Sequence, residues 1–191
     1  IEDIVSTFTI FEKSKVKHSY YELNISCPNL SGNVSFYPPK NLQELLIEID
    51  KLHLKKPLFI KMPIDKSNTE TLVLLNEIAK HQVSGVILGN LQKDRKNKYL
   101  VQEEVRKFKK GNFSGKPTHD RSNELIKLTY GNYKKRFTII GCGGVFSAKD
   151  AYEKISLGAS LVQLITGMIF QGPQLISQIN LDLISLLKKD G

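Results

Sequence analysis

A cysteine stands between two carboxamide side chains near the start of the chain. Asn24, Ser26, Cys27 and Asn29 follow a short apolar segment. A thiol in this setting can accept a proton from a substrate, and the carboxamides can hold a polar planar ligand through donor and acceptor pairs. The alternative is a structural cysteine in a turn, because free cysteine is among the most buried residue types. The residue types therefore admit base catalysis at Cys27 without requiring it.

Two more polar side chains follow apolar segments farther along. Lys61 ends one segment, and Asn90 comes directly after another. Burying an ammonium group without a partner is costly, so an anion or an electron-rich cofactor atom is expected near Lys61. A lysine that reaches past the strand end to solvent is the alternative. The pattern predicts polar groups at the ends of successive strands.

Glycine-containing turns follow the last two apolar segments. Gly143 and Gly144 form part of one turn, Thr166 and Gly167 open the other, and Ser147 lies just beyond the first. Glycine lets backbone N–H groups approach a phosphate, and the last two loops of α/β barrels commonly form a phosphate site. Purely structural turns are the alternative. Two such turns after consecutive strands favour phosphate binding.

Alternating strands and helices must position these residues. The segments typical of strands are rich in β-branched or aromatic residues, and each is expected to be buried on both faces. They are Tyr20–Ile25, Pro57–Met62, Gly85–Leu88, Phe137–Ile140 and Leu161–Ile165. Their alternation with helical patterns predicts βαβ units, a parallel sheet and the α/β class.

Helical periodicity follows several start signals. These are Asn41, the capping-box pair Ser67 and Glu70, Ser147, and Pro173. Residues 1–14 are expected to form a helix that leads into the first strand. The connection from Leu91 to Pro117 is long and polar, which is typical of a functional or mobile loop.

The number of strands bears on completeness. Five strands do not close an eight-stranded barrel, and a full (β/α)8 domain typically needs ~250 residues. We therefore expect residues 1–191 to form a single domain, the C-terminal part of a TIM barrel with about five βα units, which lacks its N-terminal βα units in this chain. A shorter open sheet that is complete as it stands is the alternative.

Composition excludes several classes of protein. The net charge of +9 comes from basic residues interspersed with polar ones, which is typical of a basic surface, and no nucleic acid partner is expected. The cysteines at positions 27 and 142 lack the spacing of a zinc site or a disulfide framework, so an intracellular location is favoured and no metal is expected. Residues 155–181 carry no charge, but glycines and a proline interrupt them, which indicates a buried strand followed by a helix.

Together these motifs resemble those of the dihydroorotate dehydrogenase family. The resemblance covers about Tyr20 to Gly191 and rests on motifs whose order and spacing are specific. They are Asn24–Asn29 with Gly32, Lys61, Asn90, Ser114–Pro117, Ile139–Gly144, and Gly158–Gln163 with Gly172 and Pro173. The resemblance implies an FMN-binding (β/α)8 TIM barrel that oxidises dihydroorotate to orotate in pyrimidine (UMP) biosynthesis.

The resemblance also implies roles for individual residues. Cys27 is the expected catalytic base, which removes a proton while hydride passes to the flavin. The expected substrate contacts are Asn24, Asn29, Asn90 and Leu91. The expected cofactor contacts are Asn24, Lys61, Gly89, Asn112, Gly115, Gly143, Gly144, Ile165 and Thr166.

Features of two branches of the family are mixed in the sequence. Cys27 is similar to the cytosolic branch, because the membrane-associated, quinone-reducing branch carries Ser there, whereas residues 114–126 and 155–173 look like the quinone-reducing branch. We expect a quinone as electron acceptor, with fumarate or NAD as alternatives. The expected location is cytoplasmic or peripheral on the inner face of a membrane, with any membrane contact in the absent N-terminal region. An oligomer is compatible with these features.

Three positions depart from the family pattern. Asn112 stands where a second glycine is usual, Leu91 replaces a threonine, and Ile165 replaces the tyrosine of the quinone-reducing branch. The alternatives to the main interpretation are a dihydropyrimidine dehydrogenase domain, a tRNA dihydrouridine synthase, or a truncated, inactive barrel that acts as a binding module.

Overall fold

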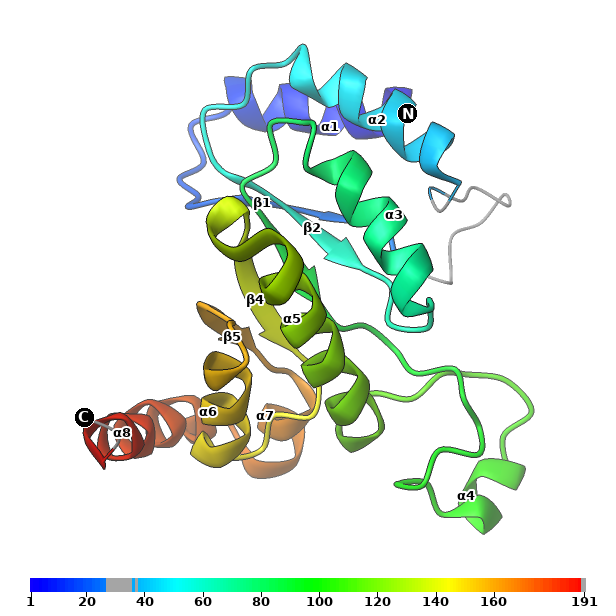
Figure 1. The fold of residues 1–191 in the computed structure, drawn as a ribbon, viewed down its shortest axis with the longest axis vertical. Coiled ribbons are helices and arrows are strands. Elements are labelled where there is room, and N and C mark those ends of the chain that lie inside the picture. Colours follow the sequence, from blue (N-terminus) through cyan, green and yellow to red (C-terminus); the bar gives the residue numbers. More distant parts are fainter. Residues whose placement is uncertain (27–35, 37, 190–191) are drawn as a thin grey trace.

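A five-stranded parallel sheet lies at the centre of the computed structural model, which describes residues 1–26, 36 and 38–189 (Figure 1). The strands are β1 (Tyr21–Asn24), β2 (Leu58–Met62), β3 (Gly85–Leu88), β4 (Thr138–Cys142) and β5 (Leu161–Gln163). They pair in chain order, each parallel to the next. The predicted parallel sheet and α/β class are therefore confirmed, and all five strands lie within two residues of their predicted bounds.

Helices connect the strands in sequence. The α-helices are α1 (Glu2–Lys13), α2 (Pro39–Asp50), α3 (Asn68–Ile78), α4 (Gln102–Arg106), α5 (His119–Tyr133), α6 (Ala148–Ser156), α7 (Thr166–Gln171) and α8 (Gln174–Lys189), and the 3-10 helices are η1 (Lys116–Thr118) and η2 (Lys134–Arg136). Along the sheet, α2 packs against α3, α3 against α5, and α5 against α6. This succession, visible in Figure 1, is that of consecutive βα units in a barrel.

The main core lies between the sheet and these helices. Alternate strand residues such as Leu23, Ile60 and Val86 are buried there against Leu45 of α2 and Leu75 of α3. Because successive side chains of a strand point to opposite faces, this periodicity fixes which strand residues face the helices and which face the other side. The residues of interest for chemistry lie at the strand ends and on the other face.

The inner face of the sheet carries a smaller apolar cluster of Phe59, Ile87 and Ile140. The prediction that every strand is buried on both faces is wrong for the two outermost strands. Glu22 on β1 and Leu161 on β5 are exposed. The reason is that no opposing layer covers the inner face of these strands within the part of the chain that the structure describes.

Two of the predicted helix starts are confirmed in detail. Ser67 accepts a hydrogen bond from the backbone N–H of Glu70, whose side chain accepts one from the Ser67 backbone, so the capping box is complete. Ser147 likewise caps α6. The prediction at Asn41 is wrong, because α2 begins two residues earlier at Pro39, where a proline in the first turn loses no helical hydrogen bond.

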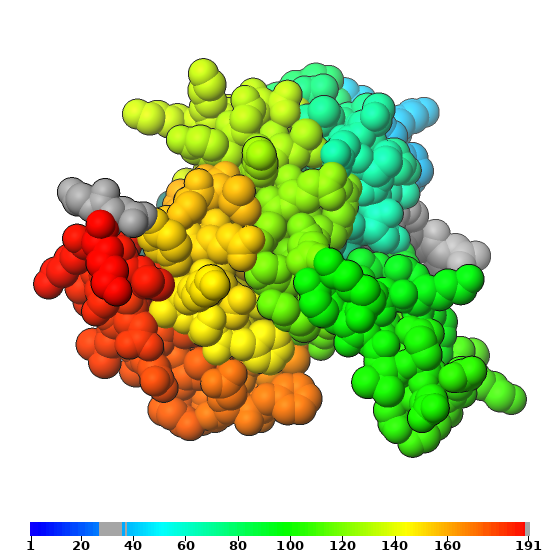
Figure 2. All heavy atoms as spheres, turned by 60° about the horizontal axis from the view of Figure 1, so that its bottom comes forward, coloured from blue at the N-terminus to red at the C-terminus, as the bar shows by residue number. Residues whose placement is uncertain are grey.

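The long connection after β3 is closed at its base by a short antiparallel bridge. Gln92 and Phe113 exchange backbone hydrogen bonds of 2.7 and 2.8 Å. Between them, the Arg95 guanidinium donates to the carbonyl oxygen of Val105 at 2.8 Å, and the segment that contains α4 projects from the body of the molecule (Figure 2). The bridge returns the chain to the sheet immediately before Ser114.

The uncharged stretch from residue 155 to 181 runs through the end of α6, β5, α7 and the first half of α8. The expected strand followed by a helix is therefore confirmed. Over the described ranges, no helix has both the length and the apolar character needed to cross a membrane.

Candidate active site

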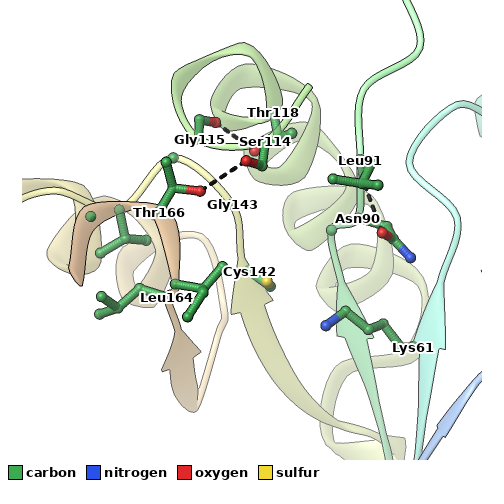
Figure 3. Close-up of a pocket in the computed structure, with 15 residues that line it drawn as sticks. Lys61, Asn90, Leu91, Ser114, Gly115, Thr118, Cys142, Gly143, Leu164 and Thr166 are labelled. Atoms are coloured by element: carbon green, nitrogen blue, oxygen red, sulfur yellow. Dashed lines mark hydrogen bonds between the residues drawn. The ribbon is translucent and has the colours of Figure 1, made fainter. Parts of the chain in front are cut away.

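The carboxyl ends of the strands surround a small cavity of about 100 Å³ (Figure 3). Its walls come from the end of β2, the segments that follow β3, β4 and β5, and the return of the long connection. The predicted site residues that line it are Lys61, Gly89, Asn90, Leu91, Gly115, Gly143, Gly144, Ile165 and Thr166. Residues far apart in the sequence thus meet at one edge of the sheet, as the barrel interpretation requires.

Two predicted site residues that the structure describes are not among those that line the cavity. Asn24 ends β1, and Asn112 lies in the long connection just before the cavity wall begins at Ser114. Cys27 and Asn29 lie outside the described residues. The proposed base is therefore placed by sequence alone, directly after Ser26, the last described residue before it.

A hydrogen-bond chain connects the ends of β1 and β3. The Ser26 hydroxyl donates to Asn24 Oδ1 at 2.8 Å, and the Ser26 backbone N–H donates to the same oxygen at 3.1 Å. Asn90 Nδ2 donates to Ser26 Oγ, and Asn90 Oδ1 accepts from the Leu91 backbone N–H at 2.7 Å. These partners fix which end of each carboxamide is the donor.

Lys61 lies beside an anion, as the sequence predicts, and this anion is the carboxylate of Glu22. Its Nζ lies 3.4 Å from Glu22 Oε1, and the two side chains are 20% and 29% exposed. The other carboxylate oxygen of Glu22 accepts a hydrogen bond of 3.0 Å from Gln163 Nε2. Glu22 and Gln163 were not predicted as site residues. The period of two along β1 places Glu22 on the same face as Asn24, the register partner of Lys61.

The turn after β4 depends on two glycines with positive φ. Gly143 has φ +113° and Gly144 has φ +70°, which L side chains rarely adopt. A Cβ at Gly143 would overlap the Thr118 hydroxyl, and one at Gly144 would overlap the Cβ of His119. The turn consequently packs closely against the start of α5 while it forms one wall of the cavity.

Hydroxyl groups complete the wall between the turn and β5. Thr166 Oγ1 donates to Ser114 Oγ at 3.1 Å, and Thr118 Oγ1 donates to the Gly115 carbonyl oxygen at 2.7 Å (Figure 3). Among the described residues, the lining contains no carboxylate, and Lys61 supplies a cation. Glycine backbone, hydroxyls and a cation form a donor set that suits an anion such as phosphate. A larger ligand must extend from the cavity onto the open inner face.

Cys142 is a second thiol at the site. It ends β4 and lines the cavity with Lys61, and Figure 3 shows the two side chains on either side of the same opening. Burial raises the pKa of its thiol, the positive charges of Lys61 and Lys154 lower that pKa, and the negative charge of Glu22 raises it. Cys142 is therefore a weak nucleophile at neutral pH and a sensor of the charges around it.

Lys154 is a fully buried amine behind the site. Its Nζ donates to Ser122 Oγ at 3.0 Å and to Asn123 Oδ1 at 2.8 Å, and its side chain passes against Gly141. Burial lowers its pKa to about 8. Because Ser122 and Asn123 belong to α5, this lysine of α6 holds the two helices together beneath β4.

A model of one protein family matches almost the whole chain. The family is described as "Dihydroorotate dehydrogenase", and the match covers residues 1–187. Proteins named "Dihydroorotate dehydrogenase (quinone)" are 37% identical over 98% of the chain in Crocosphaera subtropica and 35% identical over 90% in Nautilia profundicola. The matched regions are 50% and 46% of those two proteins, so the chain spans about half the length of the curated relatives it matches.

A solved structure shows the same arrangement of elements. The DHODH of Eimeria tenella in complex with ferulenol matches with a TM-score of 0.88 at 23% sequence identity, over 100% of this chain and 55% of that one. The ligand-free form matches with a TM-score of 0.82. At this level of identity the likeness establishes the fold alone, and it agrees with the open sheet as part of a TIM barrel.

Proposed function

Because the chain belongs to the dihydroorotate dehydrogenase family, we propose that residues 1–191 form the C-terminal part of an FMN-binding (β/α)8 barrel, whose complete form oxidises dihydroorotate to orotate in pyrimidine biosynthesis. The observation that carries this proposal is a convergence on one cavity at the carboxyl edge of the sheet. Lys61 lies in β2, and Asn90, Gly143 and Thr166 follow β3, β4 and β5. In α/β barrels this edge is where catalysis takes place.

The donor set of the cavity fits FMN. Gly143, Gly144 and Thr166 would hold the phosphate, through backbone N–H groups and a hydroxyl, and Lys61 would lie beside the flavin ring. The remaining proposed contacts are Asn24, Gly89, Asn112, Gly115 and Ile165. The chemistry that bound FMN supplies is acceptance of a hydride and its transfer to an oxidant.

The residues of the chain would bind the pyrimidine and move a proton. Cys27 removes a proton from C5 of dihydroorotate while hydride leaves C6. Asn24, Asn29 and Asn90 hold the pyrimidine, with Leu91 beside it. Two hydrogen bonds support this assignment. Asn90 Nδ2 donates to Ser26 and Ser26 donates to Asn24 Oδ1, so both carboxamides are oriented before substrate arrives.

We propose a quinone as the electron acceptor, and the names of the curated relatives support it. Fumarate or NAD would be the acceptor if Cys27 reflected the cytosolic branch in function as well as in residue type. Steady-state reduction of a soluble quinone, fumarate and NAD in parallel separates the three.

The first experiment is an absorbance scan of the purified protein from ~300 to 550 nm with FMN present, followed by anaerobic addition of dihydroorotate. We expect a flavin band that dihydroorotate bleaches. Cys27→Ala should retain the band and lose the bleaching, whereas Cys27→Ser should bleach slowly and faster at higher pH. Absence of a flavin band from the complete protein would contradict the cofactor assignment.

A binding module without turnover is the second candidate, and the open inner face of β1 and β5 favours it. Such a module would bind orotate or a partner protein and leave the flavin band unbleached. Binding of tRNA with a steep salt dependence would instead support the dihydrouridine synthase alternative. Titration of orotate and tRNA against the same preparation distinguishes these outcomes.

A further inference from the structure

Four side chains from four strands form a polar cluster on the inner face of the sheet. The cluster consists of Glu22 on β1, Lys61 on β2, Cys142 on β4 and Gln163 on β5. Glu22 occupies its centre, because one carboxylate oxygen lies 3.4 Å from Lys61 Nζ and the other accepts the 3.0 Å bond from Gln163. Lys61 and Cys142 also line the cavity, whereas Glu22 and Gln163 do not.

The register of the sheet explains this division. Asn24 is the partner of Lys61, and Glu22 is the partner of Phe59, so Glu22 lies one step toward the amino ends of the strands. It reaches the Lys61 ammonium from beneath the cavity. The bond from Gln163 occupies the second carboxylate oxygen and holds the first toward Lys61.

A carboxylate in this place weakens the positive potential that Lys61 exerts on the cavity. The pair is only partly exposed, so solvent screens it less than a surface pair. A ligand that gains negative charge beside Lys61 is consequently stabilised less than it would be by the lysine alone. The thiol of Cys142 lies in the same field.

We propose that Glu22 is a positioning residue that sets the positive potential Lys61 presents to the cavity, and that it thereby lowers the reduction potential of a flavin held there. The second half rests on the proposed function. Reduction places negative charge on the flavin ring, so a partly neutralised Lys61 favours the reduced form less. Replacement of Glu22 by glutamine removes the charge and keeps a side chain of similar shape.

The first test needs no cofactor. In a Cys27→Ser background, iodoacetamide reports on Cys142, and its rate is measured against pH. Glu22→Gln should lower the apparent pKa of the thiol and raise the rate at neutral pH by about tenfold, as a Coulomb interaction at an effective dielectric of ~20 implies. Lys61→Met should shift the profile the opposite way, and it keeps the test decisive if Glu22→Gln does not fold.

The matched control is Glu48→Gln. Glu48 on α2 is also paired with a lysine, Lys51, at 2.6 Å, but both lie on α2 or directly after it, away from the cavity lining. The control should keep the profile of the Cys27→Ser parent. Identical profiles for Glu22→Gln and Glu48→Gln, or an unshifted profile for Lys61→Met, would overturn the inference.

The second test measures the midpoint potential of bound flavin by equilibration with a reference dye. In Glu22→Gln, the affinity for reduced flavin relative to oxidised flavin should be about tenfold higher than in the parent. The midpoint potential should therefore be more positive. An unmoved potential with flavin bound would overturn the inference and leave the proposed function standing. Failure of the complete protein to bind flavin would contradict the proposed function, while the thiol measurement still decides whether Glu22 sets the potential at the cavity.

Discussion

Ser122 of α5 donates a hydrogen bond through its hydroxyl to the carbonyl oxygen of Leu88, the last residue of β3, at 2.8 Å. Both residues are fully buried. The chain continues from Leu88 into Gly89 and Asn90, which line the cavity, so this bond attaches the helix layer to the strand end that carries them. Lys154 donates to the same hydroxyl from behind.

Ser122→Ala should lower the free energy of unfolding by about 1–3 kcal/mol, because it leaves a buried carbonyl and a buried ammonium with one partner fewer. Chemical denaturation measures the effect. Ser185→Ala, on the exposed side of α8, is the control and should stay within about 0.5 kcal/mol of the parent. Equal midpoints for the two variants would show that the bond does not contribute.

Lys154→Met should remove a pH dependence of stability. The folded pKa of Lys154 is lowered to about 8 from 10.5, so between these values the unfolded chain holds a proton that the folded protein has released. The free energy of unfolding therefore rises with pH across that window, by up to about 3 kcal/mol, and the cost of burying the charge is fully present below pH 8. Denaturation midpoints from pH 7 to 10 should climb in the parent and stay flatter in the variant.

Gly143→Ala should weaken flavin binding and destabilise the fold together. Its φ of +113° disfavours alanine, and the new Cβ would overlap the Thr118 hydroxyl. We expect a loss of about 1–3 kcal/mol in stability and a fall in FMN affinity measured by fluorescence quenching. Gly131→Ala, where a Cβ meets nothing within 4 Å, is the matched control. Equal FMN affinity in both variants would argue against a cofactor role for the turn.

Asn90→Ala should weaken orotate binding by about tenfold or more, since a buried polar contact to a ligand is worth roughly 1–3 kcal/mol. The variant also removes the donor to Ser26 and the acceptor of the Leu91 N–H. Perturbation of the flavin spectrum by orotate provides the measurement. Asn180→Ala on α8 should bind orotate like the parent. Unchanged affinity in Asn90→Ala would remove Asn90 from the substrate site.

Ser67→Ala should destabilise the protein by about 1 kcal/mol through loss of the capping box of α3. The bonds from Ser67 lower the pKa of the Glu70 carboxyl from 4.5 to about 2. The stabilising effect of the ionised Glu70 is present above 4.5 and is lost as the pH falls through about 2. Ser67→Ala removes the hydroxyl bond and keeps the bond from the backbone N–H, so the acid-dependent loss of stability should be smaller in the variant than in the parent.

Local signals in the sequence predicted much of the fold. The fully apolar run Gly85–Leu88 predicted a strand buried on both faces, and the structure has a strand at those bounds with all four residues buried. The Ser67 and Glu70 spacing specified a helix start because both members of a capping box lie within one turn. The predicted helix start at Asn41 was wrong because Pro38 and Pro39 lie just before it. These prolines begin the helix as well as any side-chain cap.

The sequence predicted the site residues that lie at the ends of strands. It did not predict which side chains pair across strands. Lys61, Asn90 and Gly143 each follow an apolar run, so their place at one edge followed from the parallel sheet. The pairing of Glu22 with Lys61 required the register of two strands, and its bond to Gln163 required the curvature of the whole sheet. Neither the register nor the curvature can be inferred from the spacing of residues within one segment. The role of Cys27, outside the described residues, stays a prediction.

The hydrogen bond from Gln163 to Glu22 has a consequence for folding. It joins residues 141 positions apart, whereas each strand of the sheet pairs with its neighbour in the sequence. Neighbouring pairs can form one after another, each closing a much shorter loop, and closure entropy grows with loop length. The contact between β1 and β5 should therefore be absent from the folding transition state. Loss of Gln163 should speed unfolding and leave the folding rate nearly unchanged.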